Sequence, residues 1–258
     1  MFTPTDRRLL SLAVPTLGAL LAQPVFVLID TAMIGHLGTV SLAGLGVAST
    51  LVSTVVGLLV FLAYQTTASV ARLVGAGDLD AAWRTGWDGV WAGLLIGIAA
   101  AVGLAWGGRA GAEALGADPA VASEASAYLV AAAPGVVGML VVFAATGTLR
   151  GFSRVRVVLA VEVAGALANI GLNAVLIYGA GLGVTGSGLG TSIAQLGMAA
   201  AFLAVMSKEA RRARVPRGPR LSGLRGVGTA GWPLFLRTLT LRLSILATVW
   251  AAAGLGVN

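Results

Sequence analysis

Residues 127–149 have the sequence AYLVAAAPGVVGMLVVFAATGTL, which is 23 residues without a charged side chain. A helix of this length rises about 34 Å, enough to cross the ~30 Å hydrocarbon core of a bilayer. The rest of the chain has the same character, since 57% of its 258 residues are hydrophobic and only 10% are charged. A soluble domain carries about 25% charged residues. The sequence therefore predicts an all-α polytopic membrane protein.

Six further apolar segments are long enough to span a membrane. They are residues 9–36, 42–71, 87–108, 157–178, 185–206 and 229–255. With 127–149 they predict seven helices in three parts. Residues 1–206 are expected to form a six-helix N-terminal lobe, 207–228 a basic cytoplasmic linker, and 229–258 the first helix of a C-terminal lobe.

The first and the last predicted helix resemble each other in sequence. A shift of 218 residues aligns Pro15 with Pro233, and the pair Leu37-Gly38 with Leu255-Gly256. Both helices are predicted to run in the same direction, as in transporters built from two equivalent halves. We therefore expect a repeated lobe, of which the chain holds one copy and the start of the next, and a C-terminal lobe in the full-length protein.

Basic residues are distributed unevenly among the predicted loops. Fourteen Lys and Arg lie at the N-terminus and in the second, fourth and sixth loops, against Arg109 alone in the others. The positive-inside rule then places the N-terminus in the cytoplasm. The basic run from Lys208 to Arg225 has no aromatic residues. Proteins that bind single-stranded nucleic acids use aromatic side chains on which the bases stack. We predict a connector beside the lipid bilayer, and no nucleic-acid partner.

Polar side chains occur at similar depths on four of the predicted helices. Asp30 lies within the first, where a charge costs at least ~2.5 kcal/mol, so that such an acid usually faces a cavity or a partner. Asn169 and Asn173 share one face of the fifth helix, Thr191 lies on the sixth and Tyr128 begins the fourth. We predict an ion-coupling site at these five residues. For Thr191 and Tyr128 alone, hydrogen bonding between helices is an equally good interpretation.

Two prolines and one further acid complete the set of candidates. Pro15 and Pro24 remove backbone hydrogen bonds from the first helix and make it the element expected to bend. Glu162, beside Arg154 and Arg156 in the sequence, is interpreted as part of an interfacial ion pair rather than as a proton site.

Three segments resemble the multidrug and toxic compound extrusion (MATE) family, specifically its DNA-damage-inducible F-type (DinF) bacterial branch. They are Leu28-Ile29-Asp30-Thr31-Ala32-Met33-Ile34-Gly35-His36-Leu37-Gly38, Leu149-Arg150-Gly151 and Asn169-Ile170-Gly171-Leu172-Asn173. The resemblance implies twelve helices in two lobes, located in the bacterial inner membrane. It also implies multidrug efflux, the export of small organic cations or amphipathic drugs by antiport against H+ or Na+.

The resemblance also implies roles for individual residues. Asp30 matches the essential acid of the family, and Asn173 stands where related members carry a second Asp, which leaves Asp30 to act largely alone. If the ion is Na+, oxygen atoms of Asp30, Asn169 and Thr191 are the expected ligands. The bending proline and the polar partners of the acid match Pro15, Tyr128, Asn169 and Thr191.

Other functions remain open from the sequence. A lipid-linked oligosaccharide flippase of related fold is the alternative within transport, and it would be expected to have more basic residues in its cavity. A membrane-embedded enzyme is disfavoured because one His at the membrane edge, His36, and one acid deep in a span, Asp30, do not supply an acid/base pair or a nucleophile with its base. A non-catalytic scaffold would not need the polar cluster. We expect a transporter rather than an enzyme, with no cofactor other than the coupling ion.

Overall fold

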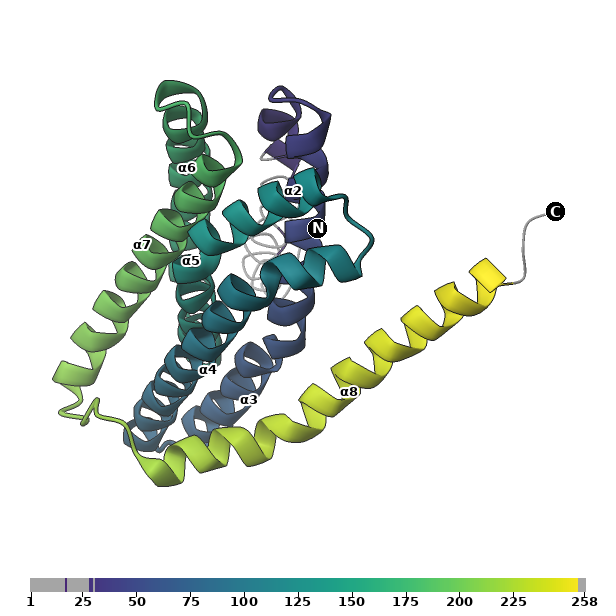
Figure 1. Ribbon diagram of the computed structural model, residues 1–258. Coiled ribbons are helices and arrows are strands. Elements are labelled where there is room, and N and C mark those ends of the chain that lie inside the picture. Colours follow the sequence, from purple (N-terminus) through teal and green to yellow (C-terminus); the bar gives the residue numbers. More distant parts are fainter. Residues whose placement is uncertain (1–16, 18–27, 30, 255–258) are drawn as a thin grey trace, which may run out of the picture.

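The computed structural model describes Leu17, residues 28–29 and residues 31–254, and these contain helices and short connections but no strand. Figure 1 shows the helices packed lengthwise as a bundle, from which the last helix extends away. In chain order the elements are α2 (Thr39–Leu59), α3 (Phe61–Gly75), α4 (Leu79–Ala114), α5 (Pro119–Gly151), α6 (Val155–Asn173), the π-helix η1 (Ala174–Gly179), α7 (Gly183–Arg212) and α8 (Leu221–Gly254).

Five segments of the described chain are long and apolar enough to cross a membrane. They are Thr39–Gly75, Leu79–Ala114, Pro119–Gly151, Val155–Gly179 and Gly183–Arg212. The predicted all-helical polytopic fold is confirmed. The helices extend beyond the predicted apolar segments, because hydropathy marks only the part of a helix that lies in hydrocarbon. The predicted first helix lies largely outside the described residues, and α8, with 34 residues, is not among the five.

Two predicted helices are divided in the structure. The predicted helix 42–71 is α2 followed by α3, joined at Val60. The predicted helix 157–178 is α6 followed by η1, so that the wider π-helical turn begins directly after Asn173. Hydropathy could not show either change, because neither interrupts the apolar composition.

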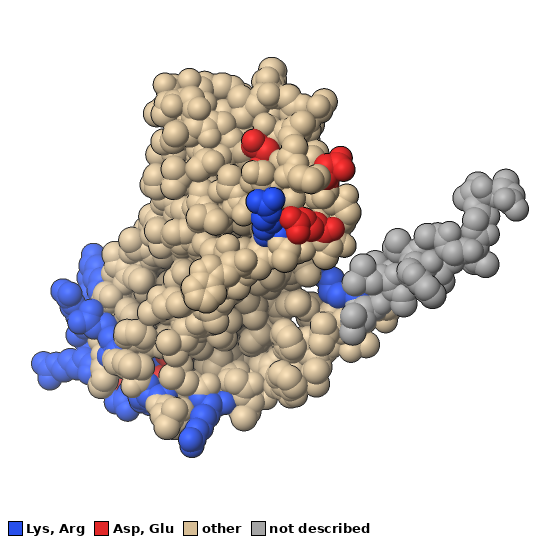
Figure 2. Space-filling model, viewed as in Figure 1, with Lys and Arg blue, Asp and Glu red and all other residues tan. Residues whose placement is uncertain are grey.

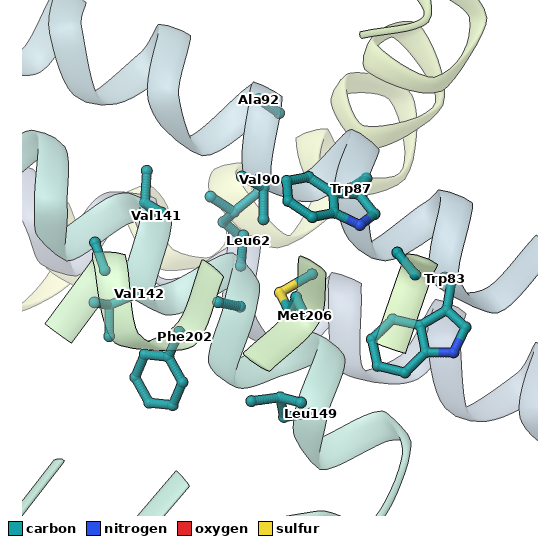
Figure 3. Packing of buried hydrophobic residues seen from close by; sticks show 14 of the residues in the cluster. Leu62, Trp83, Trp87, Val90, Ala92, Val141, Val142, Leu149, Phe202 and Met206 are labelled. Atoms are coloured by element: carbon teal, nitrogen blue, oxygen red, sulfur yellow. The ribbon is translucent and has the colours of Figure 1, made fainter. Parts of the chain in front are cut away.

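Helix α5, which contains the 127–149 segment, is the centre of the bundle. It contacts α2, α3, α4, α6 and α7 and is the most buried of the five candidate spans. Figure 3 shows part of the core that it forms with α4 and α7. Its members there include Val141, Val142 and Leu149 of α5, Trp83 and Trp87 of α4, and Phe202 and Met206 of α7.

Glycine allows α4 to approach α5 closely. A Cβ atom on Gly93 would lie 2.7 Å from the carbonyl oxygen of Leu140, and one on Gly97 would lie 3.0 Å from the Cα atom of Val137. Small residues at four-residue intervals are typical of such helix contacts in membranes. The contact fixes α5 against α4 along its length.

Charged side chains are segregated along the bundle. In Figure 2, most Lys and Arg gather at the end where α7 meets α8, while the acidic side chains in view lie mainly near the other end, with one basic side chain beside them and one on the last helix. This arrangement agrees with helices that cross a bilayer and carry their basic ends on one side.

The basic connection between α7 and α8 is attached to α4. Residues 213–220 are not helical, and they include Pro216 and Pro219, which cannot continue a helix. Arg220 pairs with the buried Asp88 of α4, and the Trp91 indole donates a hydrogen bond of 2.8 Å to the carbonyl oxygen of Arg217. The hydrogen bonds with Asp88 raise the pKa of Arg220 above its ordinary value. The connection is therefore part of the folded bundle.

Candidate functional site

Three predicted site residues form a continuous chain of hydrogen bonds between α6 and α7. The Asn173 amide donates to Asn169 Oδ1 at 2.9 Å, and the Asn169 amide donates to Thr191 Oγ1 at 3.3 Å. Their exposed fractions are only 1%, 2% and 3% for Asn173, Asn169 and Thr191. The first bond follows from their spacing, since residues four apart on a helix are neighbours. We call these three residues the amide chain.

A glycine on α7 makes room for the amide chain. A Cβ atom built on Gly190 would overlap Asn173 Oδ1, so that a larger residue there would displace the amide. The π-helix η1 starts directly after Asn173, and π-helical turns within helices are frequent at functional sites. The Asn173 amide is thus accommodated by a glycine on α7 and is followed at once by the change to the π-helix.

Tyr128 lies at the same level on the neighbouring α5. A Cβ atom on Gly188 of α7, three residues before Thr191, would lie 2.7 Å from the Tyr128 carbonyl oxygen. The Tyr128 side chain is buried in a cluster with Ile34 and Ile177. The structure therefore places Tyr128 beside the part of α7 that carries the amide chain.

Sequence reasoning missed Ser192 of α7, whose hydroxyl bonds to backbone groups of α5 beside a proline. Pro134 lies inside this helix, where it removes one hydrogen bond and its ring disturbs the preceding turn. The Gly135 N–H donates to Ser192 Oγ at 3.0 Å, and the Ser192 hydroxyl donates to the Ala131 carbonyl at 2.7 Å. The hydroxyl thus bridges the Gly135 N–H and the Ala131 carbonyl, two backbone groups four residues apart beside Pro134. Pro134 was a visible signal for such a defect, but not for the residue that fills it.

A cavity of about 390 Å³ lies between α2, α3, α5, α6 and α7. This volume falls within the usual range for small-molecule pockets, roughly 300–1,000 Å³. The lining is mainly apolar, and Asn169 connects it with the amide chain. The polar residues that line it are Tyr64, Thr146, Arg150, Glu162, Asn169 and Gln195.

The charged residues of the described lining are Arg150 and Glu162, and they pair with each other. Arg150 Nη2 lies 3.5 Å from Glu162 Oε1. The sequence suggested Arg154 or Arg156 as the partner, which is wrong, because Arg154 pairs with Glu209 of α7 at 3.0 Å. The fold brings the end of α5 over α6, a relation that sequence distance does not show.

Asp30, Pro15 and Pro24 lie outside the described residues, but the segment that follows Asp30 is described. Residues 31–35 are helical, and Ile34 is fully buried in the same cluster as Tyr128. The Tyr178 hydroxyl of η1 donates to the Met33 carbonyl at 2.6 Å. His36 Nδ1 lies 2.7 Å from the carbonyl oxygen of Ala32, in its own helix. This segment therefore packs against the elements that hold the site.

The MatE family model matches residues 15–175, which include α2 to α6 and the amide pair of α6. The chain belongs to the MATE family. A probable multidrug resistance protein NorM of Bradyrhizobium diazoefficiens is 32% identical over 252 residues, which are 95% of this chain and 52% of that protein. The DNA damage-inducible protein F of Escherichia coli is 32% identical over 203 residues, 75% of this chain and 42% of that protein.

Solved MATE structures share the fold. The Vibrio cholerae MATE transporter VcmN in its bent form superposes with a TM-score of 0.84 at 22% identity, covering 97% of this chain and 57% of that one. The chain thus spans about half the length of the curated MATE relatives given above. Members of the family are ion-coupled transporters and not enzymes, and this chain is a multi-pass membrane protein.

Proposed function

We propose that the chain forms the N-terminal lobe of a cation-coupled antiporter for multidrug efflux. In this proposal a second, C-terminal lobe completes the transporter, which exports cationic or amphipathic organic compounds across the bacterial inner membrane. The N-terminus lies in the cytoplasm, because the basic connection between α7 and α8 then faces the anionic inner leaflet. The observation that carries the proposal is the buried amide chain, which borders a cavity large enough for a small molecule.

Asp30 is the proposed ion carrier, with Asn169, Asn173, Thr191 and Tyr128 around it. Ile34 follows it by four residues in the sequence and is buried beside Tyr128. Positions four apart on a helix share a face, which supports a location for this acid near the site. A carboxylate that exchanges its cation there can bias the bundle between two arrangements, if each form prefers one of them. Pro15 and Pro24 are the proposed hinge.

The coupling ion is either H+ or Na+. Asn169 Oδ1 and Thr191 Oγ1 are oxygen atoms of the kind that hard cations bind, and each already accepts one hydrogen bond. Na+ would bind the remaining lone pairs of these oxygens, whereas H+ would be carried by the Asp30 carboxylate. Among the described residues, no group of three or more His, Cys, Asp or Glu could hold a metal, so that Na+ would depend on Asp30 together with these neutral oxygens.

The relatives do not decide the branch within the family. The NorM relative and the DNA damage-inducible relative are both 32% identical to the chain, so that the F-type assignment stays a prediction from the three segments quoted in the sequence analysis. An oligosaccharide flippase is not favoured, because Arg150 is the one basic residue in the described cavity lining.

The test is export by vesicles that contain the two-lobed protein with Asp30→Asn. We expect efflux of the fluorescent cation ethidium to stop, because an amide cannot alternate between a charged and a neutral form. Asp118→Asn is the matched control, since Asp118 is exposed and its side chain does not cap α5. Imposing a proton gradient and a sodium gradient separately identifies the ion. Unchanged efflux by Asp30→Asn would refute the proposal.

A further inference from the structure

The cavity contains one positive and one negative side chain within an otherwise neutral described lining. Arg150 comes from the last turn of α5, and Glu162 lies two turns into α6. Both border the same space as Asn169. The surrounding apolar wall includes Val142, Phe143 and Met198.

The contact between the two charges leaves much of their binding capacity unused. It is a single contact of 3.5 Å, whereas an Arg–carboxylate pair in its strongest form makes two shorter parallel hydrogen bonds. The side chains remain 36% and 22% exposed. Each group can therefore receive a further partner from the cavity.

A third polar side chain borders the same space. The Thr146 side chain is 4% exposed, and its hydroxyl oxygen has no hydrogen-bond partner among the described residues. Thr146 lies one helical turn before Arg150 on α5 and also lines the cavity. Buried polar atoms usually have a partner, but this oxygen is covered in the structure, so that it would reach a ligand only after rotation about the Cα–Cβ bond of Thr146.

We propose that this cavity selects zwitterionic amphipathic compounds, with an ammonium group at Glu162, a carboxylate at Arg150 and an apolar part against the wall. A ligand with only a positive charge would draw Glu162 away and leave Arg150 without a counter-charge in a largely apolar space. A ligand with only a negative charge would draw Arg150 away and leave Glu162 without a counter-charge. A zwitterion supplies both partners at once. This inference rests on the proposed transport function and narrows its substrate class.

The test uses three fluorescent probes that differ only in charge. They are Nε-dansyl-lysine, which is zwitterionic at its α-carbon, its methyl ester, which is a cation, and its Nα-acetyl derivative, which is an anion. Dansyl emission increases in an apolar site, so that each probe can be titrated against the chain in lipid nanodiscs, with empty nanodiscs subtracted. We expect the zwitterion to bind at least about tenfold more tightly than the other two, the effect of one charged hydrogen bond.

Variants of the pair locate the selectivity. Glu162→Gln and Arg150→Gln should each reduce zwitterion binding about tenfold, and the double variant should bind the three probes alike. The matched control is Arg109→Gln with Glu113→Gln, an exposed Arg–Glu pair with a contact of 3.1 Å outside the cavity, and it should keep the preference. Thermal unfolding of each variant identifies any that has not folded, and in that case the reversed pair Glu162→Arg with Arg150→Glu replaces it. The reversed pair keeps both charges in the cavity, so that the zwitterion should bind in the opposite orientation and remain preferred over the other two probes.

Equal binding of the three probes by the wild-type chain would overturn the proposal, as would a preference that survives in the double variant. These results are independent of the Asp30 experiment, which measures transport. Zwitterion selectivity together with active Asp30→Asn would remove the ion carrier but keep the cavity assignment. Lost selectivity together with inactive Asp30→Asn would remove the cavity assignment but keep Asp30 as the ion carrier.

Discussion

The attachment of the α7–α8 connection to α4 predicts an unequal response to the loss of its two charged partners. The Asp88 side chain is 5% exposed, whereas the Arg220 side chain is 44% exposed. Arg220→Met leaves a carboxylate buried without its cation, which costs about 3–5 kcal/mol in a fully buried pair. Because Arg220 borders solvent, water can reach part of the site, and we reduce the expected cost to about 2 kcal/mol.

Asp88→Asn should cost less, about 1 kcal/mol, because the amide oxygen still accepts a hydrogen bond and Arg220 can turn to water. For a chain of this size, about 2–4 °C of melting temperature corresponds to 1 kcal/mol. Thermal unfolding of the purified chain in detergent should therefore show a decrease of about 4–8 °C for Arg220→Met and about half of that for Asp88→Asn. The double variant should lose less than the sum of the two.

The matched control for this experiment is Arg217→Met. Arg217 is exposed and gives only its backbone carbonyl to Trp91, so that its side chain should be dispensable. The reasoning would be refuted if Arg217→Met decreased the melting temperature as much as Arg220→Met. It would also be refuted if the effects of Asp88→Asn and Arg220→Met were additive, since partners in one ion pair are coupled.

Three further predictions concern close contacts between helices. Gly190→Ala should displace Asn173 and destabilise the chain by about 1–3 kcal/mol, as measured by thermal unfolding, whereas Gly197→Ala on the same helix meets no atom within 4 Å and should have no such effect. Ser192→Ala should remove the hydrogen bonds of the hydroxyl to the Gly135 N–H and the Ala131 carbonyl, at a cost of about 1–2 kcal/mol. Hydrogen exchange should then show faster exchange of the Gly135 amide. Unchanged exchange would contradict the bridge. Gly93→Ala should separate α4 from α5 and lower the melting temperature by several degrees, and a melting temperature equal to that of Gly197→Ala would show that the contact tolerates a methyl group.

Relations within one helix could be predicted from the sequence. The contact between Asn169 and Asn173 follows from their spacing of four, and the structure confirms it with a direct hydrogen bond. The membrane class followed from apolar length, because crossing a hydrocarbon layer requires a minimum helix length whatever the details of packing. These predictions depend on the geometry of a single helix, which is nearly the same in every protein.

Relations between helices could not be predicted in the same way. The partner of Glu162 is Arg150 rather than the nearer Arg154, and Arg220 meets Asp88 across 132 positions of the chain. Such pairs depend on how far each helix is rotated and shifted along its neighbour, which small residues and kinks decide through packing. The contact of Ser192 with α5 is of this kind, since it requires α7 to pass Pro134 at one particular height.

Helix α6 carries both Asn169 of the amide chain and Glu162 of the proposed ligand pair, which would allow ligand and ion to act on each other in the proposed antiporter. Asn169 joins α6 to α7 through Thr191, while Glu162, two turns earlier and about 10 Å away along the axis, joins α6 to α5 through Arg150. A zwitterion bound between Glu162 and Arg150 would change the second connection, and a cation exchanged at the amide chain would change the first. Antiport requires that one binding event alter the free energy of the other. In the proposed antiporter, a helix held at two levels by two neighbours would provide this link, because any rotation that breaks one connection also changes the geometry of the other.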